Sequence, residues 1–341
     1  MRLPLLAAAA LTLSAGPAMA QSTSQSTPPF FVSETGKGFS SLAEAVNAIG
    51  DGDGTILIAP GRYGDCAVQT AGRVAYVARQ EGTVTFDGGV CEGKATLVLR
   101  GRGAHVQGIR FTHEVVPDGN GAGIRLEQAN LTVVASTFVD AQCGILSGDE
   151  ASTNTVTVDR SSFAGLGKDP RGHGAHAMYI GRVRALKVTN SRFERGTGGH
   201  YIKSRAPNIE VLNSSFDDSR GTMTNYMIDL PNGAIGRIAG NAFVNGLGKE
   251  NRTTFISVAP EGRENTSAGL VIENNKAWLV PNYPWQTAFV ANWTSDPVIQ
   301  RNNTLAPGIT QFKRMADSGA RKLLRMAYYY ISDKASALLA G

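Results

Sequence analysis

Turn-forming residues precede a phenylalanine in three segments: Asn190-Ser191-Arg192-Phe193, Asn213-Ser214-Ser215-Phe216 and Gly240-Asn241-Ala242-Phe243. The phenylalanine recurs along the chain at Phe111, Phe138, Phe163, Phe193, Phe216 and Phe243, at intervals of 27, 25, 30, 23 and 27 residues. Five positions before each phenylalanine stands a β-branched residue: Val106, Val133, Val158, Val188, Val211 and Ile238. A period in this range indicates a repeat that stacks into a solenoid.

The length of the repeat selects the kind of solenoid. About 25 residues are too few for two helices with their turns and enough for three short strands, which predicts an all-β parallel β-helix. A single coil cannot bury its own apolar face, so the stack of coils makes the core. We expect the phenylalanine and β-branched residues to point inward, and the repeated Asn to occupy turns that tolerate unusual torsions.

The N-terminal part of the repeat region carries a resemblance to a known family. Phe39-Ser40-Ser41-Leu42-Ala43-Glu44-Ala45-Val46 predicts a short amphipathic helix, with Ser40 or Ser41 as its N-cap and Glu44 completing a capping box. Gly52-Asp53-Gly54-Thr55-Ile56-Leu57-Ile58-Ala59-Pro60-Gly61-Arg62-Tyr63 follows as a first strand and turn. Together they resemble the N-terminal cap and opening coil of the pectin-lyase-like superfamily. The resemblance implies a right-handed parallel β-helix, a fold that hosts many functions.

The two ends of the chain differ from the repeat. Residues 1–20, with Arg2, an apolar run and Ala18-Met19-Ala20, predict a bacterial signal peptide, and residues 21–29 predict a flexible lead-in. The β-helix is expected over 30–312. Residues 313–341 have apolar residues at helical spacing and predict a C-terminal capping helix, with membrane-surface binding as the alternative. We therefore expect a periplasmic or secreted monomer with no membrane span and no nucleic-acid partner.

The composition of 341 residues, with 18% charged residues and 40 glycines, excludes a disordered or coiled-coil chain. Cys66 and Cys91 can pair in an oxidising compartment, which leaves Cys143 single, or all three can be buried thiols. No Cys or His pair has the spacing of a zinc site, and we predict no metal and no cofactor.

Three coils carry unusual polar residues at equivalent positions. They read His176-Ala177-Met178-Tyr179-Ile180-Gly181, His200-Tyr201-Ile202-Lys203-Ser204-Arg205 and Tyr226-Met227-Ile228-Asp229-Leu230-Pro231. If Met178, Ile202 and Ile228 face inward, strand alternation places Tyr179, Lys203 and Asp229 outward in one column. Arg125 and Ser257 extend this column in either direction, and His176 and His200 are expected to be neighbours.

The column falls in a basic stretch of the sequence. Between Arg160 and Arg205 there are ten Lys and Arg residues and two acidic ones. Such a concentration predicts a cationic groove for an anionic ligand, and an exported β-helix with such a groove indicates an acidic, uronate-containing polysaccharide as partner.

Elimination from a uronate needs a cation for the carboxylate, a base for the C5 proton and an acid for the departing oxygen. Arg205 or Arg182 is expected to bind the carboxylate, with Asp229 and Arg125 as further substrate-binding residues. Lys203, with its pKa lowered by cationic neighbours, or His200 or His176 is the expected base, and Tyr179 the acid. This chemistry requires the groups to protrude side by side. The sequence thus predicts a polysaccharide lyase or a C5 epimerase.

Two other functions stay open. A glycoside hydrolase needs two carboxylates, and only Asp229 stands in the column, with Asp217 and Asp218 nearby in sequence. A non-catalytic exopolysaccharide-binding protein needs only the cationic groove. Each polar residue also has a plainer interpretation: a stacked histidine pair, a tyrosine covering apolar surface, or a surface ion pair between Lys203 and Asp229.

Overall fold

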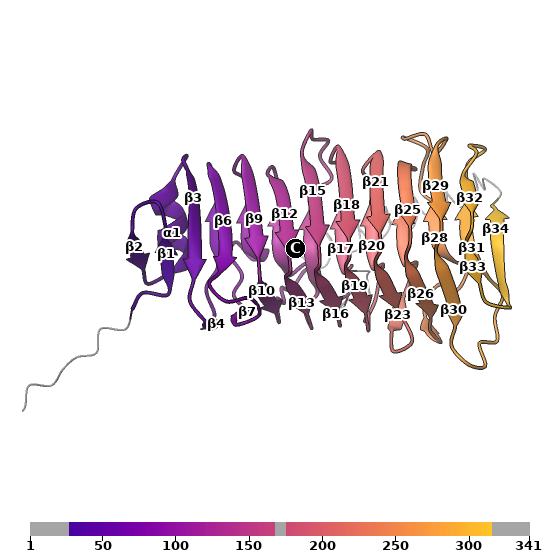
Figure 1. The fold of residues 1–341 in the computed structure, drawn as a ribbon, viewed down its shortest axis with the longest axis horizontal. Coiled ribbons are helices and arrows are strands. Elements are labelled where there is room, and N and C mark those ends of the chain that lie inside the picture. The colour runs from indigo at the N-terminus through magenta and orange to yellow at the C-terminus, as the bar shows by residue number, and fades with distance from the viewer. Residues whose placement is uncertain (1–26, 168–174, 316–341) are drawn as a thin grey trace, which may run out of the picture.

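The computed structural model describes residues 27–167 and 175–315. The expected signal peptide, most of the lead-in and all but three residues of the expected C-terminal helix lie outside the described residues. Figure 1 shows the chain winding along one long axis, with strands of successive coils side by side. Within the described residues, three long sheets run along this axis, and no helix is long and apolar enough to cross a membrane.

Each coil contributes one strand to each long sheet, named here A, B and C. Sheet A contains β2 (Lys37–Phe39), β1 (Phe30–Val32), β3 (Asp53–Ile58), β6 (Arg73–Ala78), β9 (Gly103–Gln107), β12 (Asn130–Val134), β15 (Thr155–Asp159), β18 (Ala185–Thr189), β21 (Asn208–Leu212), β25 (Ile235–Ala239), β29 (Leu270–Glu273) and β32 (Ile299–Arg301). Sheet B contains β4 (Gly61–Tyr63), β7 (Val84–Asp87), β10 (Ile109–Thr112), β13 (Thr137–Val139), β16 (Ser162–Ala164), β19 (Arg192–Glu194), β22 (Ser215–Asp217), β26 (Ala242–Asn245), β30 (Lys276–Leu279) and β33 (Thr304–Leu305).

Sheet C contains β5 (Ala67–Gln69), β8 (Ala95–Leu99), β11 (Ala122–Leu126), β14 (Cys143–Ser147), β17 (Met178–Ile180), β20 (Ile202–Ser204), β24 (Ile228–Leu230), β28 (Thr254–Val258), β31 (Thr287–Asn292) and β34 (Ile309–Arg314). A small fourth sheet pairs β23 (Thr222–Thr224) with β27 (Gly248–Lys249). Apart from β1, which pairs antiparallel with β2 and β3, neighbouring strands of the long sheets are parallel. The all-β parallel β-helix expected from the repeat is therefore confirmed.

The repeated phenylalanines form a stacked ladder inside the solenoid, as expected. Phe163 pairs in register with Phe138 on one side and Phe193 on the other. Ring centroids along the ladder lie 4.7–5.0 Å apart from Phe111 to Phe243. This distance matches the spacing of adjacent strands, so the fold itself sets the stacking. The β-branched column on sheet A is buried as well, with Val133 and Val158 in register.

A polar ladder closes each coil at the turn between sheets A and B. Asn190 and Asn213 have positive φ angles of 52°, as expected for turn asparagines. The next residue in each turn uses its side chain to accept a backbone N–H from the preceding coil. Ser214 Oγ, for example, accepts Ser191 N–H at 3.1 Å, and Asn241 Oδ1 accepts Ser214 N–H at 2.9 Å. These bonds satisfy buried backbone donors along the stack.

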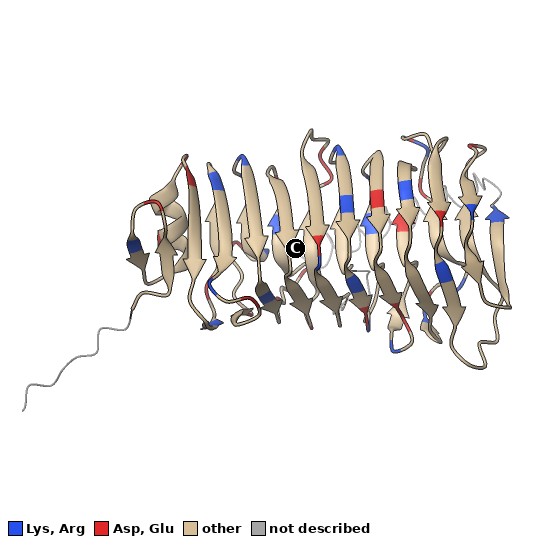
Figure 2. Cartoon of the chain, viewed as in Figure 1, with Lys and Arg blue, Asp and Glu red and all other residues tan. Residues whose placement is uncertain are grey.

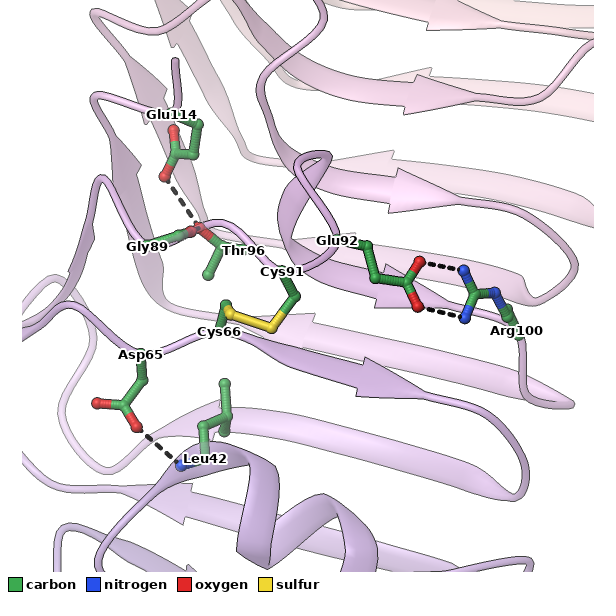
Figure 3. Close-up of a disulfide and its surroundings, with 9 residues drawn as sticks. All are labelled: Leu42, Asp65, Cys66, Gly89, Cys91, Glu92, Thr96, Arg100 and Glu114. Carbon is green, nitrogen blue, oxygen red and sulfur yellow. Dashed lines mark hydrogen bonds and ion pairs between the residues drawn. A yellow bond between two sulfur atoms is a disulfide. The ribbon is translucent and has the colours of Figure 1, made fainter. Parts of the chain in front are cut away.

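The N-terminal end of the stack is covered by helix α1 (Leu42–Ile49), which buries Leu42, Ala45 and Val46. Ser41 is its N-cap, and the capping box with Glu44 is formed. Asp65 Oδ1 accepts the N–H of Leu42 at 3.0 Å, next to the Cys66–Cys91 disulfide that links two coils (Figure 3). Cys143 is buried and lies outside this disulfide. At the other end, Lys313 and Arg314, assigned from the sequence to the C-terminal helix, lie in strand β34.

Candidate functional site

The predicted polar column forms on the outer face of sheet C. Tyr179 of β17 pairs in register with Lys203 of β20, which pairs with Asp229 of β24, which pairs with Ser257 of β28. Met178, Ile202 and Ile228 point inward and are fully buried. Strand alternation thus places the polar side chains where the sequence predicted.

The column is not an open trough, however. Lys203, Asp229 and His200 are only 8%, 1% and 9% exposed, whereas Tyr179 and His176 are partly exposed. The expectation that all these groups protrude into solvent is wrong for the first three. For Lys203 the physical reason is the loop that follows β28, because Glu261 of that loop contacts Lys203. His200 packs against the rings of His176 and Tyr226.

Lys203 is held as an ammonium ion by two carboxylates. Its Nζ lies 2.7 Å from Glu261 Oε1 and 3.4 Å from Asp229 Oδ2. Burial by itself would lower the pKa of Lys203, but Asp229 and Glu261 outweigh it, and the pKa is raised above its usual value. The expectation of a lowered pKa is wrong, because the charges nearest to Lys203 are anions. Lys203 therefore suits electrostatic stabilisation rather than the role of a base.

The two histidines are neighbours, as expected. His176 Nδ1 accepts the backbone N–H of His200 at 3.1 Å, and the two Nδ1 atoms lie 3.2 Å apart. Since a backbone N–H can only donate, His176 Nδ1 carries no proton here and its proton lies on Nε2. Burial, His200 and Lys203 lower the pKa of His176 well below its usual value, so His176 is neutral at pH 7. On its other side, His200 Nε2 lies 3.5 Å from Asp229 Oδ2.

Arg205 links the exposed and buried parts of the cluster. Its Nε donates to Tyr179 Oη at 2.8 Å, and its terminal nitrogens contact Glu261 Oε2 at 2.6 Å and Asn232 Oδ1. Although burial opposes it, the bonds to Tyr179 and Glu261 raise the pKa of Arg205. In turn, burial acts to raise the pKa of Glu261, but Lys203 and Arg205 lower it to about 2. Glu261 is thus a permanent carboxylate at neutral pH.

The two other predicted substrate-binding residues lie at the edge of this cluster or beyond it. Arg125 stands in the column, but Leu146 separates it from Tyr179. Arg182 is partly exposed and forms ion pairs with Asp149 at 2.8 Å and Glu264 at 3.0 Å. Asp149 also lies 3.4 Å from both Tyr179 Oη and Arg205 Nε, so it connects Arg182 to the cluster. The structure therefore joins Tyr179, Lys203, Asp229, His176, His200 and Arg205, with Arg182 linked through Asp149 and Arg125 outside.

The basic stretch does not make a cationic face. Lys187 lies in β18 of sheet A, Arg192 in β19 of sheet B and Lys203 in β20 of sheet C. Lys187 is paired with Glu210 at 2.9 Å and Arg192 with Glu194 at 2.5 Å. Figure 2 shows positive and negative segments interspersed along the coils. The expectation of one cationic groove fails because a single coil visits all three sheets, so residues close in sequence face different directions.

Sequence reasoning missed Glu261, Asn232 and Asp149. Glu261 lies 58 residues after Lys203 and belongs to no strand. The available signal was the coil length: 34 residues separate Phe243 from its register partner Ala277, more than in the earlier coils. The extra residues form the loop that brings Glu261 into contact with Lys203.

A shallow depression of about 390 Å³ lies elsewhere, over β3, β6, β9 and β12 of sheet A, with Arg73, Arg102 and His105 in its lining. It shares no residue with the column on sheet C. Among residues 27–167 and 175–315, no group of three His, Cys, Asp or Glu side chains could hold a metal ion. The polar column is the candidate site because its groups are mutually bonded and chemically complementary.

The described geometry defines a parallel β-helix protein with a compact acid–base cluster on one sheet. No family model and no curated protein matches the chain. Among solved structures, it is similar to a pectin methylesterase from Aspergillus niger, with 12% identity, a TM-score of 0.41 and coverage of 82% of this chain and 87% of the other. It is also similar to a protein of Geobacillus virus E2, with 12% identity, a TM-score of 0.45 and coverage of 80% and 57%.

A third similar structure is a tailspike protein from Acinetobacter baumannii bacteriophage Fri1, a capsular polysaccharide depolymerase. The identity is 11%, the TM-score 0.38, and the coverage 83% of this chain and 62% of the other. At these identities the likeness concerns the fold. The parallel β-helix that the sequence resemblance implies is confirmed by the three long sheets of the structure itself.

Proposed function

We propose that this protein is a carbohydrate-active enzyme that removes the C5 proton of a uronate residue in an acidic polysaccharide, as a lyase or a C5 epimerase. The observation that carries the proposal is the convergence of a phenol, two imidazoles, an ammonium and a guanidinium from two adjacent coils. The phenol contacts the guanidinium, the two imidazoles contact each other, and Asp229 connects His200 to Lys203. A surface that only stabilised the solenoid would need no such combination.

The structure supports a division of roles within the cluster. Tyr179 and His176 are partly exposed and adjacent, with ring centroids 5.6 Å apart, so these two groups can exchange protons with a substrate. Lys203 and Arg205 are the cations, and they stabilise the charge that develops on the carboxylate when C5 loses its proton. Asp229 and His200 are buried, and they contact Lys203 and His176 rather than the substrate.

In the lyase reaction, Tyr179 acts as the base rather than as the acid expected from the sequence: its phenolate takes the C5 proton and becomes a phenol, the C4–O bond breaks, and a C4=C5 double bond forms. Arg205 stabilises the phenolate that this step requires, because it already donates to the same oxygen at 2.8 Å. The departing oxygen takes the proton from Nε2 of His176, and Nδ1 of His176 takes a proton from Nδ1 of His200, so His176 stays neutral. This relay requires His200 to start as an imidazolium beside the carboxylate of Asp229 and leaves it as a neutral imidazole. In the epimerase reaction no bond to C4 breaks, and His176 returns a proton to the opposite face of C5.

The hydrolase alternative gains one observation and loses another. Glu261 supplies the second carboxylate that the sequence did not show, in contact with the same Lys203 as Asp229. A pKa of about 2 keeps Glu261 ionised, so it cannot serve as the general acid of glycoside hydrolysis, and Asp229 is 1% exposed. Proton transfer by Tyr179 and His176 is the better supported chemistry.

We further propose export to the periplasm or the medium. The Cys66–Cys91 disulfide supports this proposal, because structural disulfides persist mainly in oxidising compartments. An acidic polysaccharide substrate would also be met there.

The test is incubation of purified protein with a panel of uronate-containing polysaccharides. A lyase produces unsaturated uronates that absorb in the ultraviolet, and an epimerase incorporates solvent deuterium at C5 without chain cleavage. We expect Tyr179→Phe to lower kcat by at least about 100-fold, because it removes the proton-transfer group, while binding persists. Tyr63→Phe, near the N-terminal cap, is the matched control.

Other outcomes overturn the proposal. New reducing ends without ultraviolet absorbance would establish a hydrolase. Binding without any product, with the same affinity in Lys203→Ala, would establish a non-catalytic binding protein. Full activity in Tyr179→Phe would remove Tyr179 from the mechanism.

A further inference from the structure

The pair of cations in the site already has a carboxylate between them. Glu261 Oε1 lies 2.7 Å from Lys203 Nζ, and Glu261 Oε2 lies 2.6 Å from an Arg205 terminal nitrogen. Both oxygens of one carboxylate are thus used, one for each cation. The side chains of Lys203 and Arg205 are only 10% and 15% exposed, so the interaction is shielded from solvent.

Lys203 and Arg205 are fixed by the fold rather than by Glu261. Lys203 lies in the centre of β20 and also contacts Asp229. Arg205 follows the same strand and is held by Tyr179 and Asn232. A site that keeps its geometry through other contacts is preorganised for whichever carboxylate enters it.

Glu261, in contrast, comes from the loop between β28 and β29. Its backbone is anchored, because Glu261 N–H and Gly262 N–H both donate to Pro231 O at 3.0 Å. The side chain is 20% exposed and has three rotatable bonds, so a rotamer change moves the carboxylate to solvent without moving the loop.

We infer that Lys203 and Arg205 form a carboxylate-binding site that the chain occupies with its own Glu261, and that a carboxylate ligand binds there by displacing Glu261. If the proposed function holds, the displacing ligand is the uronate carboxylate of the substrate. The internal carboxylate then lowers the affinity of the free protein for anionic sugars and keeps the two cations paired when the site is empty.

The inference can be tested without any enzymatic assay. In Glu261→Ala the two cations lose their partner, and we expect added acetate to bind between them and stabilise the protein. At a tenfold excess of acetate over its dissociation constant, the thermal midpoint should rise by about 2–4 °C relative to chloride at equal ionic strength. Wild-type protein should show no such difference.

Glu264→Ala is the matched control. Glu264 lies on the same loop, but it forms its ion pair with the partly exposed Arg182 and not with Lys203 or Arg205. We expect no acetate-specific stabilisation in this variant. Should Glu261→Ala fold poorly, Glu261→Gln keeps the shape of the side chain and removes its charge, and it should bind a uronate oligosaccharide about tenfold more tightly than wild type.

Acetate that stabilises all three proteins equally, or none of them, overturns the inference. So does a Glu261→Gln variant that binds the uronate oligosaccharide more weakly than wild type. The proposed function fails separately: acetate rescue of Glu261→Ala with no product from any polysaccharide leaves the carboxylate site standing and removes the catalytic role.

Discussion

Glu114 gives the sharpest quantitative prediction for the stability of the fold. Its side chain is fully buried, and Figure 3 shows its carboxyl group pointing toward Thr96. Thr96 Oγ1 donates to Oε1 at 3.2 Å, while Oε2 has no hydrogen-bond partner among the described residues. Burial raises the pKa of Glu114 to about 7, and hydrogen bonds offset only part of that effect.

The shift converts directly into a pH dependence of stability. Below pH 4.5, the usual pKa in the unfolded chain, Glu114 is protonated in both states and the stability contribution is fully present. Between pH 4.5 and about 7 the unfolded chain releases this proton while the folded protein keeps it, so stability falls over this range and the loss is complete once the pH has risen through about 7. A difference of about 2.5 pKa units corresponds to about 3 kcal/mol.

Replacing the group isolates this contribution. The free energy of unfolding in urea should be measured for wild type and Glu114→Gln from pH 4 to pH 9. Contributions of all other groups cancel in the difference, so Glu114→Gln should gain about 3 kcal/mol over wild type between the two ends of the range. A difference that stays constant within about 0.5 kcal/mol across this range would show that Glu114 does not titrate differently in the folded and unfolded protein.

Three further predictions concern the scaffold. Phe163→Ala removes one ring from the middle of the stacked ladder and should lower the unfolding free energy by about 3–5 kcal/mol in urea titration, whereas a loss below about 1 kcal/mol would mean that the ladder is not a unit. Replacing Cys66 and Cys91 with Ala opens a link with a sequence separation of 25 and should cost about 3 kcal/mol, so an unchanged denaturation midpoint contradicts it. Lys249→Met removes the cation that lies 3.2 Å from the buried Asp218 and should lower the unfolding free energy by about 3–5 kcal/mol in calorimetry. Adding Asp218→Asn should recover part of this loss, and no recovery would argue against a stabilising ion pair between the two residues.

The fold could be predicted from the sequence because each coil of the solenoid repeats the same pattern of buried residues. Residues such as Phe163 and Val158 repeat at one coil's length since each must stack on its equivalents above and below. The same regularity placed Tyr179, Lys203 and Asp229 in one outward column, since strand alternation fixes which side chains leave the core.

The protonation states and the solvent access of that column could not be read from the sequence and came from the three-dimensional packing. Glu261 comes from a loop 58 residues beyond Lys203, outside the repeat, and it contacts Lys203, raises the pKa of Lys203 and fills the place between Lys203 and Arg205. The basic residues around Arg192 lie on three different sheets, because residues that are close in sequence face different directions around one coil. Periodicity records contacts between equivalent positions, whereas protonation and access depend on whichever non-repeating segment packs above them.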